Sequence, residues 1–441
     1  MIDRLSLALE RRGHASARDL TRLTGGATME SWRFSAGEQN FVLRRAPSPE
    51  VMEGRALTHA AEARIIAAAH EAEVLAPEVV FVLEPEDGLG SGFVMHALDG
   101  TSDPRVLLEV ADPGALLAQC AEQLARIHAL GKSDVPGEVP AFALIPALDE
   151  LEERFRLAGG DRPIIALALR WLREHAFPIE NPVLIHGDFR MGNILAEDSQ
   201  LTGVLDWDLA HLGDHHEDLA YACMAVWRFH RVERGAMGLG SIDSFLDAYR
   251  EAGGPPIDRA RFDYWRIYRT CWWALGCLSM GRTWREGADR TLERAVISRR
   301  TSEQEIDLLL LLESDHPDAA SENVDGPMPA FDEALGEVDI AELAIAVAEW
   351  LGEAKERMEG HDRFQNAVAR NALGIIARDW REMGSLSRDS LLAEALLSGE
   401  RTLSEPGLLA RLRRHALTKG AVDAPKYPSL RRARQLWIGD D

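Results

Sequence analysis

The segment "LIHGDFRMGNIL", residues 184–195, decides the fold and the function of this chain. It begins with apolar residues typical of a buried strand, brings His186, Asp188 and Asn193 close together, and then becomes apolar again. A second segment, "GVLDWDLAHLGD" at residues 203–214, makes the same change from apolar to polar. Acidic and amide side chains at the ends of buried strands indicate a binding or catalytic site.

The two segments together predict a magnesium-dependent site. Asp188 and Asn193 have the spacing of the Asp and Asn in a protein-kinase catalytic loop, where the Asp orients a hydroxyl and the Asn binds Mg²⁺. Mg²⁺ prefers several oxygen ligands, and Asp206 follows the next apolar strand. We expect a strand-loop-strand hairpin that brings these side chains together. An Asp-Asn pair in a turn is more often a structural cap, but Asp206 favours catalysis.

Composition excludes several classes of protein. The chain has 441 residues, a length typical of two or three domains, and a formal net charge of -23, which argues against a nucleic-acid partner. The four cysteines form no CxxC pair, which is typical of a reduced compartment. The N-terminus lacks the apolar core of a signal peptide, and no segment has the apolar length of a membrane span. We therefore predict a cytoplasmic protein that makes no contact with membranes.

The order of expected elements divides the chain. Residues 1–98 predict a small antiparallel sheet with one packed helix. Polar and apolar residues alternate on both sides of "SAGEQ", residues 35–39, which predicts a β-hairpin, and the spacing from Val51 to Val74 predicts the helix. Helical spacing dominates residues 99–313, apart from the two segments above. Residues 314–330 are rich in Ser, Pro, Gly and acids and predict a linker, whereas residues 331–441 predict an all-α module.

The two motif segments resemble those of the aminoglycoside phosphotransferase and choline kinase superfamily. The branch with kinase domains fused to acyl-CoA dehydrogenases is most similar, and the resemblance covers roughly residues 20–310. It implies an α+β, bilobal protein-kinase-like fold, with residues 1–98 as the nucleotide-binding N-lobe and residues 99–313 as the catalytic and substrate-binding C-lobe. It also implies ATP and Mg²⁺ as cofactors, Asp188 as the catalytic base, and Asn193 and Asp206 as metal ligands.

The same resemblance assigns nucleotide-binding residues in the first 98 positions. "TGGAT" at residues 24–28 corresponds to the loop that covers the phosphates, Arg44 to the cation on the α and β phosphates, and Glu62 to its ion-pair partner. "FVMHALDG" at residues 93–100 corresponds to the hinge where backbone groups bind adenine. The predicted nucleotide-binding residues are Gly25, Gly26, Ala27, Thr28, Arg44, Glu62, His96 and Leu98.

Three further residues are candidates for the site with less defined roles. His186 corresponds to a structural member of the catalytic loop, and Asp208 to a position that assists the metal, faces the substrate or is structural. Asp214, like Asp218, corresponds to a position that braces the loop. His215 stands where many relatives have Pro, which predicts a different rim beyond Asp214.

These assignments predict a small-molecule kinase that moves the γ-phosphate of ATP to a hydroxyl of a hydroxyacyl compound, an amino alcohol, an aminoglycoside or a sugar. One alternative is a catalytically inactive, kinase-like scaffold protein. Another is a metallophosphoesterase, which would need several His ligands on separate loops. Residues 331–441 resemble small C-terminal domains of unknown function. Their basic segments "RLRRHALTKG" and "LRRARQLW" are more typical of a solvated face, and they are also candidates to bind an anionic ligand, a partner protein or a second copy of the chain.

Overall fold

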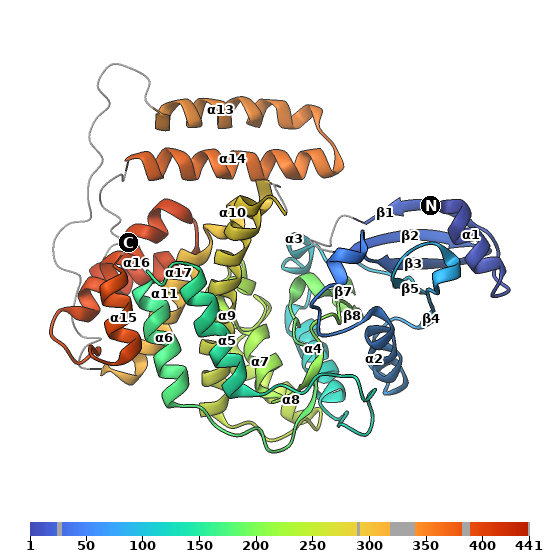
Figure 1. Cartoon of the computed structure of the whole chain (residues 1–441), viewed down its shortest axis with the longest axis horizontal. Coiled ribbons are helices and arrows are strands. Elements are labelled where there is room, and N and C mark those ends of the chain that lie inside the picture. Colours follow the sequence, from blue (N-terminus) through green and yellow to red (C-terminus); the bar gives the residue numbers. More distant parts are fainter. Residues whose placement is uncertain (24–28, 289–291, 318–339, 382–388, 440–441) are drawn as a thin grey trace. The chain divides into compact units, whose positions relative to one another are not determined.

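The computed structural model of the chain describes residues 1–23, 29–288, 292–317, 340–381 and 389–439 (Figure 1). Contacts among its elements divide the chain into two compact units. Unit 1 comprises Met1–Ala143, Ile179–Arg228 and Glu233–Phe262, and unit 2 comprises Leu144–Pro178, Phe229–Val232 and Asp263–Asp441. Among the described residues, no helix combines the length and the apolar character that a membrane crossing requires.

Unit 1 begins with a five-stranded antiparallel sheet in the order β1-β2-β3-β5-β4. Its strands are β1 (Ala17–Arg22), β2 (Glu30–Ala36), β3 (Gln39–Arg45), β4 (Val79–Val82) and β5 (Gly92–His96). The predicted hairpin is β2 and β3, which pair from Ala36 with Gln39 at the turn to Glu30 with Arg45. Gly37 has a φ of 64° in this turn, a conformation that glycine adopts without strain.

The N-terminal helix α1 (Ile2–Glu10) completes the core of this sheet. Leu5 and Leu9 on α1 are fully buried, and they belong to one apolar cluster with Phe34, Phe41 and Val94 of the sheet. The rings of Phe34 and Phe41 stack with centroids 5.5 Å apart. The helix is therefore an integral part of the sheet's core, although it precedes the first strand.

The remaining helices of unit 1 begin at identifiable caps. Helix α2 (His59–Glu71) starts where the Thr58 hydroxyl accepts the N–H of Ala61 at 3.2 Å, eight residues after the start at Val51 that the sequence pattern predicts. In α4 (Pro113–Ile127), the Asp112 carboxylate accepts the N–H of Ala115 at 2.9 Å. The other helices are α3 (Pro104–Leu107), α7 (His216–Ala222) and α8 (Ile242–Glu251), and four short 3₁₀ segments are η1 (Pro49–Met52), η2 (Pro85–Asp87), η3 (Met191–Asn193) and η4 (Ala225–Arg228).

The two polar segments form two small sheets and not one hairpin. Strand β6 (Val183–Ile185) pairs with β9 (His211–Gly213), whereas β7 (Ile194–Glu197) pairs with β8 (Gln200–Val204). Residues 186–193 form the loop between β6 and β7, and residues 205–210 form the loop between β8 and β9. The prediction of a single hairpin was wrong because the polar loop separates β6 from β7, which leaves each strand free to pair with a different partner.

Unit 2 is helical among its described residues. Its helices are α5 (Leu144–Leu157), α6 (Pro163–Glu174), α9 (Arg259–Glu286, which begins in unit 1), α10 (Leu292–Ser298), α11 (Thr301–Leu312), α13 (Ile340–Ala354), α14 (Gly360–Arg381), α15 (Ser390–Ser398), α16 (Leu408–Asp423) and α17 (Pro428–Ile438). The 3₁₀ segments η5 (Glu313–Asp315) and η6 (Lys355–Arg357) complete it. Helices α13 and α14 lie side by side (Figure 1).

The last two helices are fixed by a buried polar cluster. Helices α16 and α17 pack against α11, and Glu313 after α11 receives both the Arg413 guanidinium at 2.9 Å and the Trp437 indole N–H at 3.1 Å. Arg413 is only 2% exposed, so this pairing satisfies a charge that would otherwise be costly to bury. The C-terminal helices thus belong to the same compact unit as α5, α6 and α11. The division expected from the sequence, at residues 98, 313 and 330, stays a prediction.

Two leucines of α1 provide a matched test of its role in the core. We expect Leu9→Ala to destabilise unit 1 by about 2–5 kcal/mol, because Leu9 is fully buried and its loss leaves a cavity. Leu7→Ala on the same helix should cost less than about 0.5 kcal/mol, because Leu7 is 58% exposed. Hydrogen exchange of the β2 and β3 amides measures both values, and equal effects of the two changes would contradict the packing of α1.

Candidate active site

Arg44, the predicted phosphate-binding cation, lies on β3 and is 9% exposed. Its Nε lies 2.9 Å from Oε1 of Glu62 on α2, and its Nη2 lies 2.6 Å from Oδ1 of Asp206 in the loop after β8. Asp208 is further away, at 3.7 Å from Nη2. The structure therefore brings Arg44 and Glu62 together as the sequence predicts, and it adds Asp206 as a second partner. The partner of Arg45, the next residue, is Glu30 at 3.4 Å.

Carboxylates outnumber guanidinium groups in this cluster. Arg55 donates to Asp208 at 2.9 Å, so two cations, Arg44 and Arg55, face the carboxylates of Glu62, Asp206 and Asp208. Burial raises the pKa of Glu62 to about 7, although Arg44 acts in the opposite direction. Burial and the neighbouring Asp206 also raise the pKa of Asp208. An excess of negative charge at partly buried oxygens is an environment that favours a bound cation.

Asp188 is held by donors from three directions. Its Oδ1 accepts the hydroxyl of Tyr221 at 2.6 Å and Nε of Arg190 at 3.1 Å, and its Oδ2 accepts Nδ2 of Asn193 at 2.5 Å. The residue is 8% exposed. Because the donors fix both carboxylate oxygens, the side chain is preorganised as an acceptor at one place in the loop.

A buried carboxylate on α7 shapes the backbone that carries Asp188. Asp218 accepts the amide of His186 at 2.7 Å and the amide of Gly187 at 2.8 Å, and His128 lies 3.2 Å from the same carboxylate. Burial alone would raise the pKa of Asp218, but the hydrogen bonds from His128 and His186 hold it below its usual value. Gly187 has a φ of 81°, and a Cβ there would lie 2.4 Å from the carbonyl oxygen of Leu209. Only glycine fits this turn.

The predicted structural residue His186 links the two polar loops. Its Nδ1 accepts the amide of Asp188 at 3.2 Å, so its Nε2 carries the proton and donates to the carbonyl of Leu205 at 3.0 Å. The amide of Leu205 in turn donates to the carbonyl of Asn193 at 2.8 Å. These bonds connect the loop that carries Asp188 to the loop that carries Asp206.

Asn193 and Asp206 line one cavity of about 410 Å³. The Nδ2 of Asn193 donates to the backbone oxygen of Asp188 at 2.9 Å, which leaves the amide oxygen for another partner. Asp206 has a φ of 67°, an uncommon conformation for a residue other than glycine, and its side chain is 33% exposed. One carboxylate and one neutral amide oxygen in the same cavity fit the hard oxygen ligands that Mg²⁺ prefers.

The end of β5 also contributes to this cavity. His96 and Leu98 line it together with Val42, Met95 and Trp207. The amide of His96 donates to the carbonyl of Glu78 at 2.9 Å, and the amide of Ala97 donates to Asn40 at 2.9 Å. Of the two predicted adenine-binding positions, Leu98 therefore remains the one whose amide is a candidate donor. The predicted phosphate-covering residues Gly25, Gly26, Ala27 and Thr28 lie outside the described residues.

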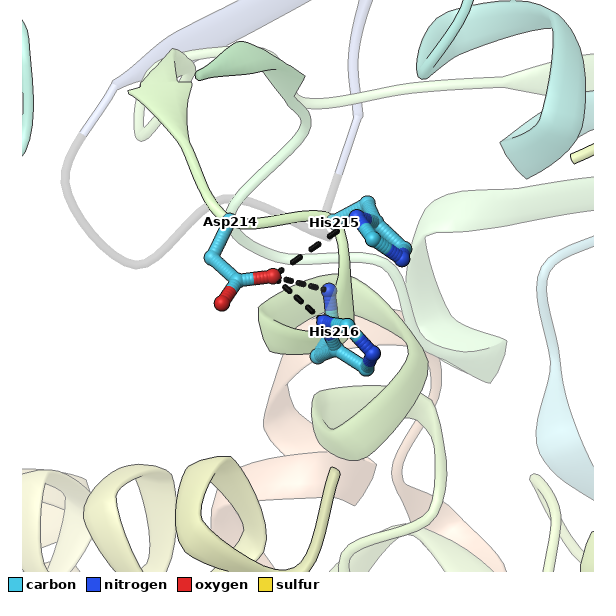
Figure 2. A group of neighbouring side chains, drawn as sticks. All are labelled: Asp214, His215 and His216. Atoms are coloured by element: carbon cyan, nitrogen blue, oxygen red, sulfur yellow. Dashed lines mark hydrogen bonds and ion pairs between the residues drawn. The ribbon is translucent and has the colours of Figure 1, made fainter. Parts of the chain in front are cut away.

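Asp214, His215 and His216 cluster at the start of α7 (Figure 2). His216 donates from Nδ1 to Asp214 at 2.5 Å and accepts the amide of Asp258 at Nε2, at 2.8 Å, so both of its nitrogens are used within the protein. His215 donates from Nε2 to the carbonyl of Pro256 at 3.1 Å. Asp214 also accepts the amide of His216 at 3.1 Å. Because protein groups already use both nitrogens of His216 and one of His215, the arrangement does not favour the metal cluster that a metallophosphoesterase needs.

Sequence reasoning assigned no role to Tyr221, Arg190 or Arg55. Tyr221 lies three residues after Asp218, on the same face of α7, so helical spacing within "EDLAYA" offered a signal for it. Arg190 belongs to the first motif, and its guanidinium stacks over the Trp227 ring at 4.9 Å. Arg55 lies in an irregular segment before α2, where no pattern indicated a contact with Asp208.

A comparison with protein families shows the family to which the chain belongs. Its residues 19–265, more than half of its length, match the family described as "Phosphotransferase enzyme family". The chain belongs to this family. Acyl-CoA dehydrogenase family member 10 of Mus musculus is 26% identical over 275 residues, which cover 55% of this chain and 25% of the mouse protein. This similarity confirms the predicted resemblance to the branch linked to acyl-CoA dehydrogenases, although the matched region spans only a quarter of that relative's length.

Solved structures confirm the predicted fold. One is a protein of Ralstonia eutropha JMP134 described as an aminoglycoside phosphotransferase, with a TM-score of 0.56 and 18% identity over 68% of this chain and 95% of that one. A second is a thermostable mutant of aminoglycoside phosphotransferase APH(4)-Ia in complex with AMP-PNP and hygromycin B, with a TM-score of 0.50 and 19% identity over 70% of this chain and 98% of that one. At such identities the likeness shows the fold alone. The chain has the α+β, protein-kinase-like fold expected from its motifs.

His59 lies near the guanidinium groups of Arg44 and Arg55, and we expect it to make the stability of the fold depend on pH. Burial, with Arg44 and Arg55 nearby, lowers the pKa of His59 from 6.5 to about 4. Between these values the unfolded chain binds a proton that the folded chain does not, so the free energy of unfolding should fall as the pH decreases from 6.5 to about 4. In His59→Gln this contribution is absent, so its free energy of unfolding should fall less. Urea unfolding of the wild type and of His59→Gln at about pH 7.5 and about pH 5 measures how far the free energy of unfolding falls in each protein. Identical pH dependence in the two proteins would show that His59 is not shielded from protonation.

Proposed function

We propose that this chain transfers the γ-phosphate of ATP to a hydroxyl group of a small molecule. The observation that carries the proposal is the convergence of Arg44, Asn193 and Asp206 on one cavity, with the catalytic loop of Asp188 hydrogen-bonded to Asn193. A phosphotransferase needs cationic and metal-binding groups at the phosphates and an acceptor for the proton of the attacking hydroxyl. The residues of this chain supply each of these types.

Asn193 and Asp206 are the residues that would hold Mg²⁺, which neutralises the charge of the phosphates when it is bound. Arg44, fixed by Glu62, is the proposed contact for the α and β phosphates. A guanidinium presents a planar fork of donors, and it replaces the single ammonium of the usual kinase lysine. Leu98 is the proposed backbone contact for the adenine ring.

Asp188 is the proposed catalytic base. The oxygen of the acceptor hydroxyl forms a bond to the γ-phosphorus while the bond from that phosphorus to the bridging oxygen of ADP breaks. The hydroxyl proton passes to the carboxylate of Asp188, which Tyr221, Arg190 and Asn193 hold in place. These donors hold the carboxylate oriented, so it needs little rearrangement when the acceptor arrives.

The proposed acceptor is a small hydroxylated molecule. Similarity to a protein named acyl-CoA dehydrogenase family member 10 favours a hydroxyacyl compound over an amino alcohol, an aminoglycoside or a sugar. The alternative function is a kinase-like scaffold without catalysis. The observation that favours that alternative is the contact of Arg44 with Asp206 at 2.6 Å, because it engages a proposed metal ligand.

Removal of Asp188 tests catalysis directly. We expect Asp188→Ala to lower the rate of phosphate transfer by about 10² to 10⁴, because proton transfer to a positioned group contributes that factor. Transfer of labelled phosphate from ATP to a panel of hydroxylated compounds provides the assay. Asp198→Asn, at an exposed position in the β7–β8 turn, is the control and should keep the wild-type rate. Near-normal turnover in Asp188→Ala would remove Asp188 as the base, and no transfer by the wild type would favour the scaffold.

A further inference from the structure

Unit 2 contains a second cavity, of about 570 Å³, lined by residues of α5, α9, α10, α11, α14 and α16 and of the loop between α5 and α6. Its volume lies within the range of about 300–1,000 Å³ that small-molecule sites occupy in proteins. Every residue that lines it belongs to unit 2, so it is distinct from the site around Arg44. None of the roles proposed for the nucleotide or the acceptor uses it.

The lining of this cavity is cationic, in contrast to the chain as a whole. Five cationic side chains and three carboxylates line it, which leaves a surplus of two positive charges in a protein of formal net charge -23. The charged lining residues are Arg154, Arg162, Arg282, Arg299, Lys419, Asp161, Asp379 and Asp423. A local surplus of this sign inside an acidic protein indicates an anionic ligand.

Internal ion pairs account for only part of these cations. Arg299 pairs with Asp423 at 2.6 Å and with Asp379 at 3.1 Å, and Lys419 pairs with Asp423 at 2.9 Å. Arg162 lies 3.6 Å from Glu305 and 3.8 Å from Asp161. Arg154 forms no ion pair with any residue that the structure describes. Among the same described residues, the only ion-pair partner of Arg282 is Glu286, at 3.9 Å between two exposed side chains. Arg154 and Arg282 are therefore the guanidinium groups left for a ligand.

One of the basic segments of the sequence contributes to this cavity. Within "RLRRHALTKG", Arg411 pairs with Asp389 and Arg413 pairs with Glu313, so these two residues hold the helices together. His415 and Lys419 lie one turn apart on α16, and both line the cavity. The segment thus combines structural arginines with two residues that face the cavity.

The hydroxyl groups of the lining leave the guanidinium groups as the main hydrogen-bond donors for a ligand. The hydroxyls of Ser279 and Thr301 donate to helix carbonyls, at 2.9 Å and 3.1 Å, so they offer no proton to a ligand. Nε2 of His415 is buried and has no hydrogen-bond partner among the described residues. Burial lowers the pKa of Lys419, and the nearby Arg299 and Arg162 act in the same direction as burial. A bound anion would relieve this repulsion.

We propose that the cavity of unit 2 binds a small molecule that carries a phosphate or diphosphate group, with Arg154 and Arg282 as its main contacts. Guanidinium groups bind phosphate oxygens in pairs, and a phosphate of two negative charges matches the surplus of the lining. The site is independent of the proposed phosphate transfer, and it would give the C-terminal helices a ligand-binding role.

Calorimetric titration of the full chain with inorganic pyrophosphate, without divalent metal, tests this site. We expect one pyrophosphate per chain, and Arg154→Gln and Arg282→Gln should each weaken binding roughly ten-fold or more. Arg156→Gln is the matched control, because Arg156 lies on the same helix α5 but pairs with Glu152 and does not line the cavity. Its affinity should equal that of the wild type.

Orthophosphate in the same titration distinguishes the source of the ligand. Tighter binding of pyrophosphate would support an organic diphosphate, and equal binding would support a single phosphate group. Absence of pyrophosphate binding to the wild type would overturn the proposal. Unchanged affinity in both Arg154→Gln and Arg282→Gln would also overturn it, because the anion would then bind elsewhere. Circular dichroism of each variant checks its fold, and Arg282 is half exposed, so its replacement should leave the fold intact.

Discussion

The buried guanidinium of Arg44 is the constraint on which the arrangement of unit 1 depends. It connects β3 to α2 through Glu62 and to the loop after β8 through Asp206. Buried ion pairs add little net stability compared with apolar packing, because two charges must leave water. Their presence at a cavity is better explained by function, and the excess of carboxylates around this arginine is suited to a cation that accompanies phosphates.

A second constraint positions the catalytic loop. Asp218 accepts two successive backbone amides at His186 and Gly187, and the positive φ of Gly187 lets the chain pass close to the carbonyl of Leu209. Asp188 follows at once, where Tyr221 from the same helix as Asp218 reaches it. One short helix, α7, therefore shapes the backbone of the loop and orients its carboxylate. The two small sheets hold the ends of this loop.

Local patterns predicted much of this architecture. The alternation around Gly37 predicted the β2–β3 hairpin. The spacing of the motif residues predicted that Asn193 lies near Asp188, to which it is hydrogen-bonded, and near Asp206, with which it lines one cavity. The pairing of β6 with β9 was missed because strand pairing across a long separation leaves no signal in either segment. Arg55 and Tyr221 were missed for a related reason, since their contacts with Asp208 and Asp188 depend on the tertiary fold.

Calorimetric titration with ATP, in the presence and absence of Mg²⁺, tests most directly whether the cluster around Arg44 binds a metal–nucleotide complex. Asp206→Asn and Asp198→Asn are matched variants, because both aspartates have a positive φ and asparagine tolerates that conformation. Mg²⁺-dependent binding that is retained in Asp198→Asn and weakened at least roughly ten-fold in Asp206→Asn is the expected result. Equal affinity in Asp206→Asn, or binding indifferent to Mg²⁺, would contradict the assignment of this site.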